Sequence, residues 1–226
     1  MRAAVVVFPG SNSDQEMIHS LREIMGFDTT VVAHTDRDIP SRTDLVAIPG
    51  GFTYGDYLRS GALARASAIL PAIANHARQG GYVLGVCNGF QILTEVGLLP
   101  GALVRNSHRR FESREQCIRA ENEGPFTSKP NDVLRVVIAH ADGRYFAPHS
   151  VLDQLEGEGQ VAFRYCDEKG VVNESTNPNG SLRSIAGIYG GSKKNILGLM
   201  PHPERRSETL VGSDDGRKVF EALLRN

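Results

Sequence analysis

The chain has 226 residues, 40% of them hydrophobic and 23% charged, a balance typical of a folded protein with a substantial core. Its 25 basic and 26 acidic residues leave a net charge of −1, which argues against a nucleic-acid or membrane surface. The three cysteines contain no C-x-x-C pair, so neither a zinc site nor a disulfide framework is expected. The first apolar run is too short for a signal peptide, and no segment approaches the length of a membrane span. We therefore expect a cytoplasmic protein with reduced thiols and no metal.

The first hundred residues alternate between strand and helix patterns. Continuous apolar or β-branched runs predict strands at 3–8, 29–33, 44–48 and 82–86. Apolar residues at helical spacing predict a helix that Ser13 or Asp14 caps and Gly26 ends. Further helices are expected at 62–77, where Pro71 interrupts the pattern, and at 88–96. Such alternation predicts an α/β fold with a doubly wound, mostly parallel sheet flanked by helices, which binds ligands beyond the carboxyl ends of its strands.

The second half of the chain has a less regular pattern. Strands are expected at 111–120, 133–139, 161–165 and 196–200, and a closing helix is expected at 216–224. Repeats, low-complexity segments and long linkers are all missing from the sequence. We therefore expect residues 1–226 to form a single domain, with extra β elements in its second half.

The sequence GVCNGFQ, residues 85–91, directly follows one predicted strand. It places Cys87 between glycines two residues to either side. Small neighbours let a strand-to-helix turn close tightly and let substrate approach, as at the serine elbow of α/β-hydrolases. A helix starting behind the thiol would favour its thiolate form. This pattern predicts that Cys87 is a nucleophile.

A nucleophilic cysteine also needs a base, and two histidines follow predicted strands. His140 ends one apolar run, and His202 follows another. His202 also lies between two prolines and two residues before Glu204, whose carboxylate could hold one ring nitrogen and leave the other for the thiol. The pattern alone favours His202 over His140 only modestly, and the alternative for either is a histidine in a surface loop.

The motif GVCNGFQ followed by MPHPER resembles the class I glutamine amidotransferases, which have a flavodoxin-like fold. The resemblance implies that Cys87 is the nucleophile, His202 the base and acid, and Glu204 the residue that orients the histidine. It further implies a glutamine pocket partly shaped by Gln91. It also implies an oxyanion hole that backbone amides form at Gly50, Gly51 and Asn88. No metal ligand is implied. Cys117 and Cys166 match no motif, and we expect them to be structural.

Four longer stretches resemble the glutaminase subunits of phosphoribosylformylglycinamidine synthases: FPGSNSD, PGGFTYGDYLRSGALA, RNSHRRFESR and GLMPHPER. The resemblance implies hydrolysis of L-glutamine to glutamate and ammonia through a cysteinyl thioester. The ammonia would serve a separate ATP-dependent synthetase subunit that converts formylglycinamide ribonucleotide to formylglycinamidine ribonucleotide in purine biosynthesis. A small bridging subunit would join the two. The chain has no Walker-type phosphate loop, so no cofactor is expected on it, and ATP and Mg are expected on the synthetase.

Three other functions are compatible with parts of this pattern. A cysteine hydrolase or peptidase could share the elbow, but it would lack Gln91 and the H-x-E pair. A class I amidotransferase subunit of another synthetase would lack the PGGFTYGDYLRSG stretch. A non-catalytic interaction domain of the same fold would be expected to have lost Cys87 or His202, and both are present.

Overall fold

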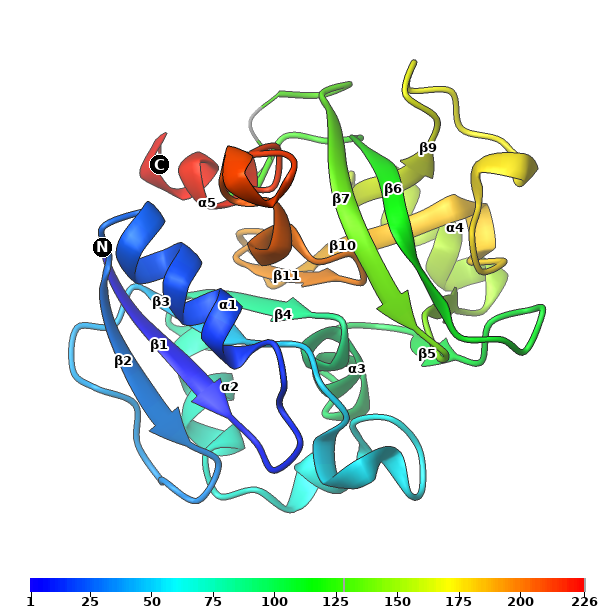
Figure 1. Cartoon of the computed structure of the whole chain (residues 1–226). Coiled ribbons are helices and arrows are strands. Elements are labelled where there is room, and N and C mark those ends of the chain that lie inside the picture. The colour runs from blue at the N-terminus through cyan, green and yellow to red at the C-terminus, as the bar shows by residue number, and fades with distance from the viewer. Residues whose placement is uncertain (128, 226) are drawn as a thin grey trace.

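A computed structural model describes residues 1–127 and 129–225 (Figure 1). Within this part of the chain, nine strands form one central sheet in the order β2-β1-β3-β4-β11-β10-β9-β6-β7, and β5 and β8 form a separate pair. The strands are β1 (Arg2–Val7), β2 (Asp28–Ala33), β3 (Leu45–Ile48), β4 (Tyr82–Val86), β5 (Ala102–Val104), β6 (Glu112–Ala120), β7 (Val133–His140), β8 (Arg144–Phe146), β9 (Val161–Cys166), β10 (Ile185–Gly190) and β11 (Ile196–Leu199).

The sheet has a parallel half and an antiparallel half. Strands β2, β1, β3, β4 and β11 pair in parallel, and the remaining strands of the sheet pair antiparallel. Strands β3, β4 and β11 are almost completely buried, which explains why their sequences are continuous apolar runs. The predicted α/β class with a mostly parallel sheet is confirmed, since five of its nine strands pair in parallel, and β6, β7, β9 and β10 of the second half extend the same sheet.

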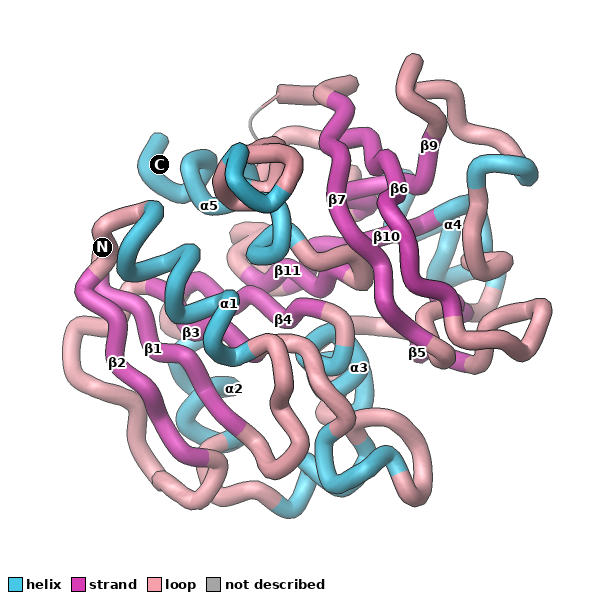
Figure 2. Tube along the Cα trace, viewed as in Figure 1, coloured by secondary structure: helices cyan, strands magenta, loops and turns pink. Residues whose placement is uncertain are grey.

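Helices flank the central sheet, and the first three of them lie on the two faces of its parallel half (Figure 1). They are α1 (Asp14–His19), which continues as a π-helix over Ser20–Ile24, α2 (Leu70–Arg78), α3 (Asn88–Glu95), α4 (His149–Gly157) and α5 (Arg217–Glu221), which continues as a 3-10 turn over Ala222–Arg225. Figures 1 and 2 show α1 in front of the sheet and α2 and α3 behind it. No helix within the described residues is long and apolar enough to cross a membrane.

The prediction of one helix over 62–77 was wrong. The chain forms a 3-10 turn at Ala62–Ala66, becomes extended at Ser67, and starts α2 only at Leu70. Pro71 does not interrupt this helix but lies in its first turn, where a missing N–H costs no hydrogen bond. Four elements, β5, β8, β10 and α4, had no counterpart among the predicted elements.

Candidate active site

Cys87 lies on a sharp turn between β4 and α3. Its backbone has φ 50° and ψ −104°, a left-handed conformation that a non-glycine residue adopts only at a cost. The neighbouring glycines allow the turn, because a methyl group at Gly85 would lie 2.7 Å from the backbone of Gly89. A methyl group at Gly89 would lie 2.1 Å from the carbonyl oxygen of Ile48. The GVCNG sequence therefore forms the strained elbow that the flanking glycines predict.

Sheet order brings His202 to this elbow. Strand β11 is the parallel neighbour of β4, with Leu199 opposite Val86, so His202 follows its strand at the same sheet edge as Cys87. The His202 amide donates to the Val137 carbonyl of β7 at 2.8 Å, which fixes the histidine backbone. Of the two strand-end histidines, His202 is the one that the fold places beside the thiol.

Glu204 orients the His202 ring. Its Oε1 lies 2.6 Å from Nδ1 of His202, and both residues are almost fully buried. Nε2 of the histidine is buried with no hydrogen-bond partner among the described residues. Burial alone would lower the pKa of His202, but the Glu204 carboxylate and the Cys87 thiol outweigh it and raise that pKa to about 9. This environment favours the protonated imidazolium form of His202.

Gly50 lies where the side chains of the site converge. A methyl group on it would be 2.6 Å from Cε1 of His202 and 3.4 Å from Cβ of Cys87. The Gly50 carbonyl accepts the amides of Asn12 and Ser13, each at 3.2 Å. Because a trans peptide points its N–H away from its C=O, the amide of the following glycine, at position 51, faces away from those two donors. Two hydrogen bonds thus support one of the peptide orientations open to residues 49–51, named here the oxyanion loop, and their role as oxyanion donors stays a prediction.

Asn88 and Gln91 lie on the first turn of α3, and their side chains form a connected buried chain. The Asn88 side-chain oxygen accepts from the amide of Thr53 at 3.1 Å and also from its hydroxyl. Its Nδ2 donates to Oε1 of Gln91 at 2.8 Å, and Nε2 of Gln91 donates to the Asp142 carbonyl at 2.8 Å. The Asn88 backbone N–H is one of the first amides of α3, which have no partner inside the helix. These hydrogen bonds connect Thr53, just after the oxyanion loop, to Asp142, in the turn after β7.

His140 is also buried, but its ring is engaged elsewhere. Nδ1 lies 3.2 Å from Oδ1 of Asn106, and Nε2 lies 3.4 Å from Nδ2 of Asn179. Burial, with a smaller contribution from the nearby His202, lowers the pKa of His140 to about 4. A neutral ring with both nitrogens bound is a poor base for Cys87.

Cys117 and Cys166 lie opposite each other on β6 and β9, and both are buried. Burial raises the pKa of each thiol, that of Cys166 to about 12, so neither resembles an activated nucleophile. Across the described residues, His, Cys, Asp and Glu nowhere gather in a group of three or more that could hold a metal ion.

Four residues of this region were missed by sequence reasoning or assigned another role. Ser13 was expected to cap a helix, yet its hydroxyl makes no cap bond and instead accepts from Nη2 of Arg205 at 2.7 Å. Thr53 and Asn106 lie within stretches that carry the family resemblance, which was a usable signal. Asn179 lies in none of those stretches, so its place beside His140 had no signal in the sequence.

Known proteins are similar to this chain over nearly its full length. A family model described as a CobB/CobQ-like glutamine amidotransferase domain matches residues 1–218. Phosphoribosylformylglycinamidine synthase subunit PurQ of Bradyrhizobium diazoefficiens is 48% identical over 229 residues, which cover 100% of this chain and 98% of the relative. The protein of the same name from Aquifex aeolicus is 49% identical, with 99% of each chain covered.

Solved structures agree with these relatives. The structure of PurLQS from Thermotoga maritima has a chain 41% identical to this one with a TM-score of 0.86, covering 99% of this chain and 97% of that one. A glutamine amidotransferase from Thermotoga maritima superposes with a TM-score of 0.57 at 17% identity, which supports the fold alone.

Proposed function

The chain belongs to the CobB/CobQ-like glutamine amidotransferase family, and on that premise we propose that it releases ammonia from L-glutamine at Cys87. Its function is that of the glutaminase subunit of a phosphoribosylformylglycinamidine synthase. The observation that carries this conclusion is full-length identity of 46–49% to eight relatives of that name. The buried pair of His202 and Glu204 beside a strained cysteine supports the same chemistry.

The first half of the reaction forms a thioester. The Cys87 thiolate attacks the side-chain carbonyl carbon of glutamine, a C–S bond forms, and the carbonyl electron pair moves onto oxygen. Backbone N–H groups at Gly50, Gly51 and Asn88 would stabilise that oxyanion, and losing one such donor typically costs ~3–4 kcal/mol of barrier. When the tetrahedral intermediate collapses, the C–N bond breaks and the His202 imidazolium gives its proton to the departing ammonia.

The second half of the reaction hydrolyses the thioester. The now neutral His202 takes a proton from water as the water oxygen attacks the carbonyl carbon. Collapse of this second tetrahedral intermediate breaks the C–S bond and releases glutamate, which leaves the thiolate and imidazolium paired again. Glu204 holds Nδ1 throughout, so that Nε2 exchanges the proton at each step.

The released ammonia passes to a synthetase subunit, the partner of this chain. We propose that the synthetase holds the ATP and Mg needed to activate formylglycinamide ribonucleotide and that a small bridging subunit completes the complex. One sequence observation supports this division: the chain has no Walker-type phosphate loop. The three free cysteines support a cytoplasmic location.

The test is to assemble the complex with Cys87→Ala. We expect synthesis from glutamine to be abolished and synthesis from added ammonium salts to be retained, because the synthetase site lies on another chain. Cys117→Ala is the matched control and should retain both activities. Loss of both activities in a correctly assembled Cys87→Ala complex would contradict the proposal, as would glutamine-dependent synthesis at the wild-type rate.

A further inference from the structure

The end of β7 and the turn after it border the catalytic residues. Residues 139–143, named here the pocket wall, contribute two carbonyl groups to the site. The Ala139 oxygen lies 3.8 Å from Sγ of Cys87, and the Asp142 oxygen accepts from Nε2 of Gln91 at 2.8 Å. The wall therefore touches both the nucleophile and the residue expected to shape the glutamine pocket.

Regular sheet pairing holds only the first part of the pocket wall. The β6–β7 ladder ends at the pair of Glu112 and His140, so the backbone of 141–143 needs other partners. The Asn106 amide donates to the Ala141 carbonyl at 2.8 Å. Side-chain Oδ1 of Asn106 accepts from the Gly143 amide at 3.1 Å, and its Nδ2 donates to the His140 carbonyl at 3.0 Å. One buried asparagine thus binds three residues of the wall.

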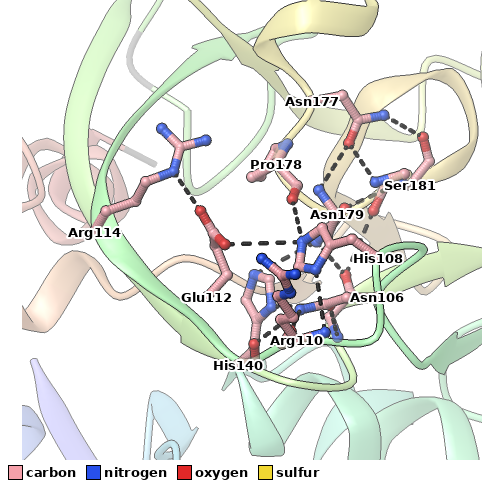
Figure 3. Close-up of polar contacts among 12 residues, drawn as sticks. Asn106, His108, Arg110, Glu112, Arg114, His140, Asn177, Pro178, Asn179 and Ser181 are labelled. Carbon is pink, nitrogen blue, oxygen red and sulfur yellow. Dashed lines mark hydrogen bonds and ion pairs between the residues drawn. The ribbon is translucent and has the colours of Figure 1, made fainter.

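A second asparagine, from a different part of the chain, holds the wall from the other side (Figure 3). Nδ2 of Asn179 donates to the Gly143 carbonyl at 2.8 Å and lies 3.4 Å from Nε2 of His140. Asn179 is completely buried, and its Oδ1 accepts the Ser181 amide at 3.0 Å. The two segments that carry the asparagines are also joined, because the amide of Ser107, next to Asn106, donates to the Asn179 carbonyl at 2.9 Å.

These contacts select one state of the His140 ring. Oδ1 of Asn106 already accepts from an amide, and Nδ2 is committed to two carbonyls, so Oδ1 can only accept from Nδ1 of the ring. Nδ1 therefore carries the proton, and Nε2 accepts from Asn179. The ring is neutral, in one tautomer, and bound at both nitrogens. His140 thus acts as a spacer between the two asparagines.

We infer that Asn106 and Asn179 are positioning residues for glutamine: through His140 and the backbone of Gly143, they fix the pocket wall against Cys87 and Gln91. Neither asparagine touches Cys87, so their effect passes through the wall. This inference rests on the proposed function, since it concerns the binding of glutamine at Cys87. A wall displaced by about an ångström would disturb substrate placement, a change that can cost ~100-fold.

The test compares Asn106→Ala with Asn195→Ala in the assembled complex. Asn195 is a matched control, because it is equally buried and its Nδ2 donates to two backbone carbonyls, those of Ala77 and Gly81, away from the pocket wall. We expect Asn106→Ala to raise KM for glutamine by at least tenfold, with kcat within threefold and ammonium-dependent synthesis unchanged. Asn195→Ala should lower thermal stability but leave KM within twofold.

A second variant covers the case in which Asn106→Ala does not fold. Asn179→Ser keeps a small polar side chain and should raise KM in the same direction, and His140→Asn should be milder than His140→Ala because it retains a donor for Oδ1 of Asn106. Unchanged KM in Asn106→Ala or Asn179→Ser, or an equal rise in Asn195→Ala, would overturn the inference. Failure of the proposed function is distinguishable, because the wild-type complex itself would then release no glutamate from glutamine.

Discussion

Replacing Glu204 with glutamine removes the charge that keeps His202 protonated while preserving the size of the side chain. The carboxylate lies 2.6 Å from Nδ1 of His202 in a site from which solvent is excluded. A glutamine oxygen at the same place can still accept from Nδ1, so the ring keeps its orientation. We therefore expect a smaller loss of activity than in His202→Ala, and one that originates in electrostatics.

The size of the effect follows from the pKa of His202. That pKa is raised to about 9 from an ordinary 6.5, because the Glu204 carboxylate and the Cys87 thiol together outweigh the effect of burial. One pKa unit corresponds to ~1.4 kcal/mol, so the net rise favours the imidazolium by roughly 3 kcal/mol, and we expect loss of the carboxylate to remove roughly 2–3 kcal/mol of it. Glu204→Gln should therefore lower glutaminase kcat/KM by about 30- to 150-fold near neutral pH.

The assay measures glutamate release by the complex between pH 5.5 and 9, alongside the rate at which iodoacetamide alkylates Cys87. Both rates should fall in Glu204→Gln. Glu208→Gln is the matched control, because Glu208 binds Nε2 of His19 at 2.9 Å in a solvent-exposed pair, where the same change should have little effect. If Glu204→Gln stays within threefold of wild type, or if the two variants lose equal activity, the electrostatic role of Glu204 is refuted.

Four further outcomes are expected. A diazo-ketone analogue of glutamine should modify Cys87 and spare Cys117 and Cys166, whose thiol pKa values burial raises; peptide mass mapping would contradict this if all three were labelled evenly. His202→Ala should slow thioester formation ~100- to 10,000-fold at saturating glutamine, measured by rapid quench, and an equal defect in His140→Ala would reverse the assignment of the base. Unfolding by urea should show greatest stability near pH 6.5: the His140 contribution is lost as pH falls towards its pKa of about 4, and the His202 contribution is lost as pH rises through its pKa of about 9. Each of these two losses of stability should amount to ~3 kcal/mol. The loss at low pH should be smaller in His140→Asn, and the loss at high pH should be smaller in His202→Ala. Glutamate release by the isolated chain should be ~100- to 1,000-fold slower than in the complex, because a single misdirected amide in the oxyanion loop removes one donor; equal rates would exclude control by the partner.

Local sequence determined the parts of this protein that depend on neighbouring residues. The apolar runs before Cys87 and His202 form β4 and β11, and the glycines on either side of Cys87 are the residues that its tight turn requires. The pairing of His202 with Glu204 was also predicted from their spacing, but the expected extended segment was wrong: His202 precedes a 3-10 turn at Pro203–Arg206, which brings Glu204 to the ring. These features involve contacts within a few residues, so their signals lie in short patterns.

Elements whose formation depends on distant partners were predicted less well. The helix expected over 62–77 splits because Ser67 is extended and Pro71 suits the start of a helix, and alanine-rich composition could not indicate either. Strand β10 has glycine at two of its six positions, so its strand pattern is weak. It forms because β9 and β11 supply hydrogen-bond partners on both sides.

Only the tertiary structure decided which strand-end histidine serves Cys87. Both His140 and His202 follow apolar runs whose strands reach the site, because β11 pairs in parallel with β4 and the Ala139 carbonyl of β7 lies 3.8 Å from Sγ of Cys87. The ring of His140 is bound by Asn106 and Asn179, which lie 34 and 39 residues away along the chain. Hydrogen bonds over such separations depend on strand order and loop paths, which no local pattern of residues specifies. The partners that the fold supplies to each ring, Glu204 for His202 and two asparagines for His140, therefore made one histidine a candidate base and the other a fixed part of the pocket wall.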